Sequence, residues 1–153
     1  MSTHSIERTE VITHARKARL KGQLADLDYK RDVRALASLL SQHELAREIG
    51  VSQPAISKTL KQAADLPQVP EGFSGATPLE ICERYAAGEI DRDQLIKELG
   101  EWDYPPRDTT DGYDTILVDP IGSFGDVELA HLRGLIDDAI YDAVLDLVTD
   151  SPS

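Results

Sequence analysis

The sequence has little with which to build disulfides, metal sites or a membrane anchor. Its 153 residues include a single cysteine, Cys82, so no internal disulfide can form and no cysteine cluster can hold a metal. Aromatic residues make up 5% of the chain, and no run approaches about 18 consecutive apolar residues. The beginning of the chain is polar and charged and lacks the apolar run of a secretory signal peptide. These absences predict a soluble, cytoplasmic protein without a membrane segment.

The sequence also lacks the usual signatures of catalysis. Its four histidines are scattered singly, without the spacing of metal ligands. No glycine-rich phosphate loop follows a strand pattern, and no nucleophile elbow is present. Carboxylates are abundant, but abundance on solvated helix faces does not indicate acid–base pairing. We therefore expect no enzymatic activity, no cofactor and no metal.

Acidic residues exceed basic ones, with 28 Asp and Glu against 16 Lys and Arg, but the excess lies in one half of the chain. Residues 1–66 carry 11 basic and 8 acidic side chains, whereas residues 67–153 carry 5 basic and 20 acidic ones. Because salt screens charges beyond about 8 to 10 Å, a ligand responds to the local charge. The first half is therefore compatible with nucleic acid, and the acidic second half with a protein partner.

Hydrophobic periodicity predicts a mostly α-helical protein. Residues 5–40 lack proline and carry apolar residues at helical spacing. Gly22 and the polar stretch DLDYKRD favour a break into two helices near residue 28. Two basic clusters, Arg16–Lys21 and Lys30–Arg34, lie in this segment, and their spacing leaves phosphate contact and simple solvation equally open.

The positions of proline and glycine in the chain predict two small domains joined by a linker. Prolines and glycines without periodicity make residues 67–77 the linker. The N-terminal domain is then residues 1–66, and a small acidic helical domain follows at residues 78–153. We expect this second domain to bind a protein partner or to regulate the first.

The second domain contains two segments of similar order, each expected to form a helical hairpin. In both, a glycine (Gly88 or Gly134) is followed by any residue, then isoleucine, then an aspartate (Asp91 or Asp137). The glycine can end one helix in the left-handed conformation, and the aspartate can cap the next. Between the two hairpins, the apolar run Ile116–Val118 predicts one short strand.

The stretch SQHELAREIGVSQPAISKTLKQA, residues 41–63, predicts two short helices that pack on each other. Leu45 and Ile49 lie one turn apart on the first helix, and Ile56 and Leu60 lie one turn apart on the second. Such pairs place apolar side chains on one side of each helix and leave polar ones on the surface.

The residues between these two helices predict a tight turn. Gly50 is suited to positive φ, and Val51 can fill the angle between the helices. Ser52 can cap the second helix, and Pro54 fits its first turn.

This stretch resembles the helix-turn-helix of the lambda Cro and repressor superfamily, and VSQPAISKTL is also similar to the recognition helix of LysR-type regulators. The matching positions are Ala46, Gly50, Val51 and Ile56, with polar residues between them. The resemblance covers residues 42–63 only. It implies an N-terminal helix-turn-helix domain whose second helix, residues 53–63, enters the DNA major groove while the first lies across the backbone.

The resemblance also implies which side chains meet DNA. Gln53, Ala55 and Ser57 become candidates for base edges, since glutamine can pair with adenine and an alanine methyl can contact thymine. Lys58 and Lys61 become candidates for phosphates or guanine. The start of the first helix offers free N–H groups to a phosphate. The full predicted set is Gln42, His43, Ser52, Gln53, Pro54, Ala55, Ser57, Lys58 and Lys61.

These observations favour a transcriptional regulator, most simply a repressor, that binds duplex DNA sequence-specifically. One recognition helix reads few base pairs, so a homodimer or a second DNA-contacting element is expected. Two alternatives stay open. One is an antitoxin that neutralises a basic toxin through its acidic half and represses its own operon. The other is a phage DNA-packaging or assembly component.

Overall fold

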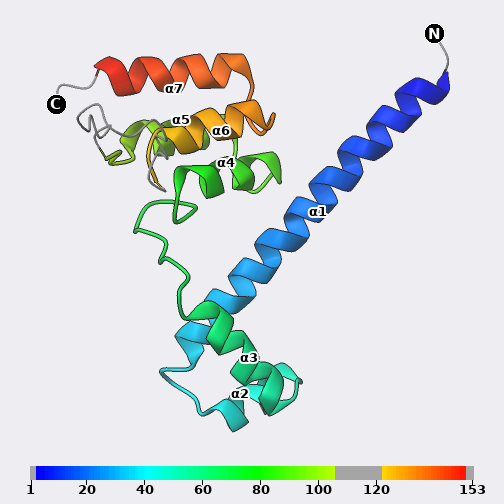
Figure 1. Cartoon of the computed structure of the whole chain (residues 1–153), viewed down its shortest axis with the longest axis vertical. Coiled ribbons are helices and arrows are strands. Elements are labelled where there is room, and N and C mark those ends of the chain that lie inside the picture. Colours follow the sequence, from blue (N-terminus) through cyan, green and yellow to red (C-terminus); the bar gives the residue numbers. More distant parts are fainter. Residues whose placement is uncertain (1–2, 106–121, 151–153) are drawn as a thin grey trace, which may run out of the picture. The chain divides into compact units, whose positions relative to one another are not determined.

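The computed structural model describes residues 3–105 and 122–150, which form seven α-helices and no strand (Figure 1). The mostly α-helical fold class predicted from the periodicity is confirmed. The chain divides into two compact units, Met1–Pro67 and Gln68–Ser153. The strand predicted at Ile116–Val118 lies outside the described residues. Among the helices that are described, none has both the length and the apolar character needed to cross a membrane.

The first unit contains a long helix followed by two short ones. These are α1 (Thr3–Leu36), α2 (Gln42–Ile49) and α3 (Gln53–Ala63). Both α1 and α2 pack against α3. The buried side chains of this unit's core come from all three helices, with partly buried apolar residues around them. They are Val33, Leu45, Ala46 and Ile56, surrounded by Tyr29, Leu40 and Leu60.

The predicted break in the first helical segment is wrong, because α1 runs through residue 28 without interruption. A glycine in a helix costs only about 1 kcal/mol relative to alanine, so Gly22 alone does not end the helix. The polar stretch stabilises the helix as well. Lys30 Nζ lies 2.7 Å from Asp26 Oδ2, one turn away on the same face.

The C-terminal end of α3 is attached to α1 by one side chain. Arg34 Nη1 donates hydrogen bonds to the carbonyl oxygens of Ala63, at 2.7 Å, and Leu66, at 2.6 Å. The helix is followed by Ala64 in a right-handed conformation, without a left-handed glycine that would bring backbone N–H groups onto its last carbonyls. The guanidinium of Arg34 therefore satisfies these acceptors and fixes the position of α3 on α1.

The second unit contains four short helices. These are α4 (Pro78–Ala86), α5 (Arg92–Glu101), α6 (Gly125–Leu132) and α7 (Asp138–Asp150). In this unit α4 packs against α5 and α6, and α7 packs against α5 and α6. Their buried side chains form one core, made of Ile81, Cys82, Leu95, Leu99, Val127, Ala130, Ile136, Ile140 and Val144.

The turns of the second unit match the prediction made from the repeated Gly and Asp positions. Gly88 and Gly134 have φ values of 85° and 76°. Asp91 accepts a hydrogen bond from the backbone N–H of Gln94, and Asp137 Oδ1 accepts one from that of Ile140, both at 2.8 Å. In both turns, therefore, a left-handed glycine ends one helix and an aspartate caps the start of the next.

Part of the segment assigned to the linker packs on the second unit. The ring of Phe73 meets that of Trp102 edge to face, with centroids 5.0 Å apart. Ser74 donates to the carboxylate of Glu98 through its backbone N–H and, at 2.7 Å, through its hydroxyl. Gln94 Nε2 donates to the same carboxylate at 2.8 Å, so Glu98 is hydrogen-bonded although only 1% exposed. Within residues 67–77, the exposed stretch is residues 67–72.

The raised pKa values of two carboxyl groups in the second unit predict how the stability of this unit changes with pH. Burial raises the pKa of Asp126, although hydrogen bonds from the backbone N–H groups of Gly122 and Leu79 oppose the shift. Burial and then the nearby charge of Glu80 raise the pKa of Glu83, with Arg133 and Arg84 opposing. A carboxyl with a higher pKa in the folded chain binds its proton more tightly when folded. Its contribution to stability is therefore lost as the pH rises through the folded pKa.

We expect urea to unfold the second unit at a higher midpoint at pH 5 than at pH 7. The chain's one tryptophan, Trp102, lies in this unit, so its fluorescence reports the transition. The double variant Asp126→Asn and Glu83→Gln should show a smaller change between the two pH values, since neither amide titrates. An equal change in the double variant would show that other groups cause the pH dependence.

Candidate nucleic-acid interface

The turn between α2 and α3 has the conformation predicted from Gly50. This residue has φ 86° and ψ 32°, in the left-handed region. The backbone N–H groups of Gly50 and Val51 both donate to the carbonyl oxygen of Ala46, at 2.9 and 3.0 Å. These bonds close the end of α2 and turn the chain sharply toward α3.

Replacing Gly50 is expected to destabilise the first unit through backbone strain alone. A Cβ atom at this position would meet nothing within 4 Å, so there is no steric clash with other residues. The left-handed conformation costs an L-residue roughly 1 to 2 kcal/mol, so Gly50→Ala should lower the free energy of unfolding by about 1 kcal/mol and Gly50→Val by more. Thermal unfolding followed by circular dichroism measures the loss.

The matched control for Gly50 is Gly22→Ala. Gly22 lies within α1, is exposed and is not among the positive-φ glycines, so alanine should leave stability unchanged or raise it. Trp102 fluorescence, recorded in the same experiment, separates the transition of the second unit. An unaltered transition in Gly50→Val would contradict the left-handed turn.

Serine caps fix where both short helices begin. Ser41 Oγ accepts from the backbone N–H of Glu44, and Ser52 Oγ accepts from that of Ala55, each at 3.2 Å. Ser52, predicted as a DNA contact, therefore acts first as the N-cap of α3, and its side chain stays exposed. Pro54 lies in the first turn of α3, as predicted.

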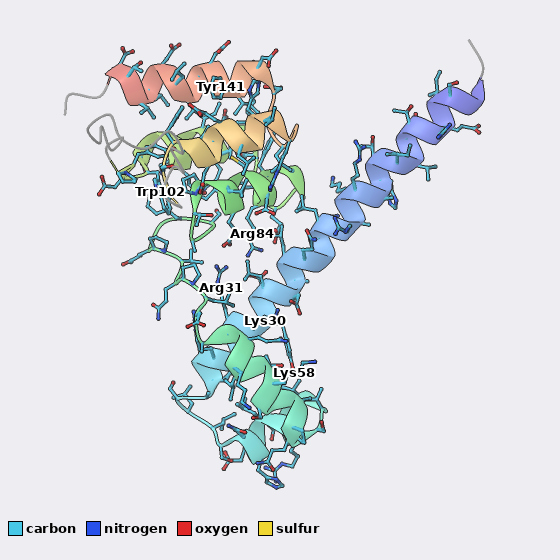
Figure 2. All side chains as sticks on the ribbon, in the orientation of Figure 1. Lys30, Arg31, Lys58, Arg84, Trp102 and Tyr141 are labelled. Carbon is cyan, nitrogen blue, oxygen red and sulfur yellow. The ribbon has the colours of Figure 1, made fainter. Side chains whose placement is uncertain are left out.

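The two sides of α3 differ in character. Ile56 and Ala63 are buried, and Leu60 is partly buried on the same side. Helical spacing places Pro54, Lys58 and Lys61 on the other side, and all three are exposed. Figure 2 labels Lys58 on this helix. A buried row thus holds the helix in the unit while two ammonium groups remain in solvent.

The starts of α2 and α3 border a shallow hollow of about 280 Å³ that is open to solvent. Its lining brings together four of the predicted contact residues, Gln42, Gln53, Pro54 and Ser57. Gln42 and Gln53 are each the first residue of a helix, and both are exposed. The hollow therefore combines amide and hydroxyl groups that can donate or accept hydrogen bonds.

The remaining predicted residues occupy different positions in the unit. His43 is exposed in the first turn of α2. Ala55 is half-buried, so less of its methyl group is available to a ligand than the sequence suggests. Lys58 and Lys61 extend the exposed side of α3 toward its C-terminal end.

The structure separates the two basic clusters that precede α2. In the cluster nearer α2, Lys30 pairs with Asp26, and Arg34 is bound to the end of α3. Arg16–Lys21 lies farther along α1, and all four of its cationic side chains are exposed. The role of Arg34 in holding α3 was missed from the sequence. The absence of a glycine after residue 63 is the signal that could have revealed it.

Outside the candidate interface, the single thiol of the chain is sequestered. Cys82 is fully buried in the core of the second unit. Burial raises its pKa to about 12, and the charges of Asp126 and Glu83 add to the shift. In the described part of the chain, no three His, Cys, Asp or Glu side chains gather in a way that could hold a metal ion.

Comparisons of the chain with protein-family models, with curated proteins and with solved structures gave no match.

Proposed function

We propose that the protein is a transcriptional regulator, most simply a repressor, that binds duplex DNA sequence-specifically by inserting α3 into the major groove. The observation that carries the proposal is the α2–α3 pair itself. Its turn is closed by Gly50, one side of α3 is fixed by buried apolar residues, and polar side chains gather where both helices begin. This combination provides a rigid exposed helix, which groove recognition requires.

The dimensions and chemistry of α3 are suited to this role. An α-helix with its side chains is about 10 to 12 Å across, which fits a major groove about 12 Å wide. Gln53 would pair with the N6 and N7 atoms of adenine. Lys58 and Lys61 would meet phosphates or guanine, because their ammonium groups only donate.

The acidity of the second unit supports different binding partners for the two units in this proposal. Its excess of carboxylates would repel a phosphate backbone, so we place DNA at the first unit and a protein partner at the second. The first unit supplies neutral hydrogen-bonding groups for reading bases and cations for binding phosphates.

Selection of bound fragments from a random pool of duplex DNA tests the proposal directly. The full chain should enrich a short common sequence, and binding should weaken as salt is raised because counterions are released. The variant Gly50→Val, which disturbs the turn, should enrich that sequence less strongly. Binding without an enriched sequence would reduce the proposal to non-specific association, and no binding at low salt would overturn it.

A further inference from the structure

The N-terminal part of α1 exposes apolar side chains that the first unit leaves uncovered. Every residue from Ser5 to Arg19 is exposed, and this part of the helix runs on beyond α2 and α3 (Figure 1). Val11 is 66% exposed and Ile12 is 41% exposed. Covering these side chains would remove apolar surface from water and so stabilise the segment. We call residues 5–21 the arm.

One side of the arm continues the side of α1 that packs in the first unit. Tyr29 and Val33 contribute to the core with α2 and α3. Steps of four and three residues back from Tyr29 keep to the same side of a helix. They reach Ala25, Gly22, Ala18, Ala15 and Val11, all of which are exposed. The packing side of α1 thus extends past α3 as a narrow row on which a second helix can approach closely.

Charges along one flank of this row are arranged in two blocks. Glu7 and Glu10 come first, and Lys17 and Lys21 follow on the same flank about two to four turns later. In a parallel pair, this flank would face the opposite flank of the second helix, so its two charge blocks would not meet. In an antiparallel pair, the same flanks meet, and each acidic block would face the basic block of the other helix. The flank is therefore complementary to itself in the antiparallel direction.

We infer that the arms of two copies of this chain pair antiparallel, centred near residue 13. Val11 then packs on Ala15 of the second copy, and the two Ile12 side chains meet at the edge of the contact between the two helices. In the same register Glu7 faces Lys21 of the second copy, and Glu10 faces its Lys17. The contact is isologous, so it closes into a symmetric dimer.

A second copy fits the arm better than a DNA backbone does. Glu7 and Glu10 share a flank with the lysines and would repel phosphates. In addition, the buried side of α3 faces the core that it shares with α1, so its exposed lysines lie on the side away from that core. The inference does not depend on DNA binding. If α3 does read DNA, each dimer carries two such helices.

Sedimentation equilibrium of the full chain without DNA tests this dimer. The wild-type mass should rise with concentration from one chain to two. Glu7→Lys places lysine against Lys21, and Lys21→Glu places glutamate against Glu7, so each variant alone should dissociate about tenfold more readily, a change of about 1.4 kcal/mol. The matched control Glu71→Lys, at an exposed position outside the arm, should leave the mass curve unaltered.

The decisive sample is an equimolar mixture of Glu7→Lys and Lys21→Glu. Only the mixed antiparallel dimer places every lysine against a glutamate, so the mixture should associate as tightly as the wild type. Circular dichroism of each variant checks that the helix content is unaltered. A mass of one chain at all concentrations would overturn the inference. So would a mixture that associates no better than its components, or single variants whose mass curves match that of the wild type.

Discussion

Replacing Arg84 by methionine is expected to lower the free energy of unfolding of the second unit by about 3 to 5 kcal/mol, because it leaves a buried carboxylate without its cation. Arg84 Nη2 lies 3.1 Å from Glu80 Oε2, and both side chains are only 7% exposed. Arg84 Nη1 also lies 3.2 Å from Glu89 Oε2 at the edge of this cluster (Figure 2 labels Arg84). Glu80 would keep a hydrogen bond from the backbone N–H of Ala76 but would lose the guanidinium that balances its buried charge.

Urea unfolding followed by Trp102 fluorescence measures this loss in the second unit alone. The double variant Glu80→Gln and Arg84→Met should recover more than half of it, because glutamine removes the buried charge and can still accept from Ala76. Arg92→Met, an exposed position in the same unit, is the matched control. If Arg84→Met unfolds like this control, the buried pair does not stabilise the unit.

Replacing Gln53 by alanine is expected to lower affinity for the specific DNA site by about 1 to 3 kcal/mol and to leave non-specific binding nearly unaltered. The substitution removes hydrogen bonds to a base edge but no charge. Lys61→Ala should instead weaken binding to both kinds of DNA and reduce the slope of log affinity against log salt by about one, because one counterion fewer is released. Titrations of each variant against the selected site and an unrelated duplex, at several salt concentrations, measure both effects.

Each of these two substitutions has a matched control in the chain. Gln62→Ala removes the same amide from an exposed position near the end of α3 and should leave site preference intact. Lys97→Ala removes the same charge from an exposed position of the second unit and should leave the salt slope unaltered. Equal losses for Gln53→Ala and Lys61→Ala on both duplexes would show that α3 does not read bases from its N-terminal end. No loss in either variant would remove the basis for DNA binding.

Features that depend on a few neighbouring residues could be predicted from the sequence. The left-handed Gly50 and the caps Ser52, Asp91 and Asp137 were predicted, because backbone conformation and one hydrogen bond decide each of them. The position of Gln53 beside Ser57 also follows from helical spacing. Its proximity to Gln42 does not, because that depends on the angle at which α2 meets α3.

Features that depend on distant residues could not be predicted. Glu80, Arg84 and Glu98 look like residues of solvated helix faces, yet the fold buries each of them. Glu80 and Arg84 pair with each other one turn apart, whereas Ser74 reaches Glu98 from 24 positions away. Phe73 falls within the predicted linker, because nothing near it in the sequence indicates its contact with Trp102. The break was predicted wrongly because glycine and polar residues disfavour a helix only weakly, so neither ends α1.

Because Cys82 is buried, its thiol can report when the core of the second unit opens. Alkylating reagents react with the thiolate, which is scarce at neutral pH when the pKa is about 12, and they must also reach a fully buried sulfur atom. Labelling of the folded chain should therefore proceed only when the core of the second unit opens. Its rate, followed by intact mass, would report the frequency of that opening. The same sequestration means that two folded copies cannot be crosslinked through this residue, so a covalent dimer would identify molecules that had already unfolded.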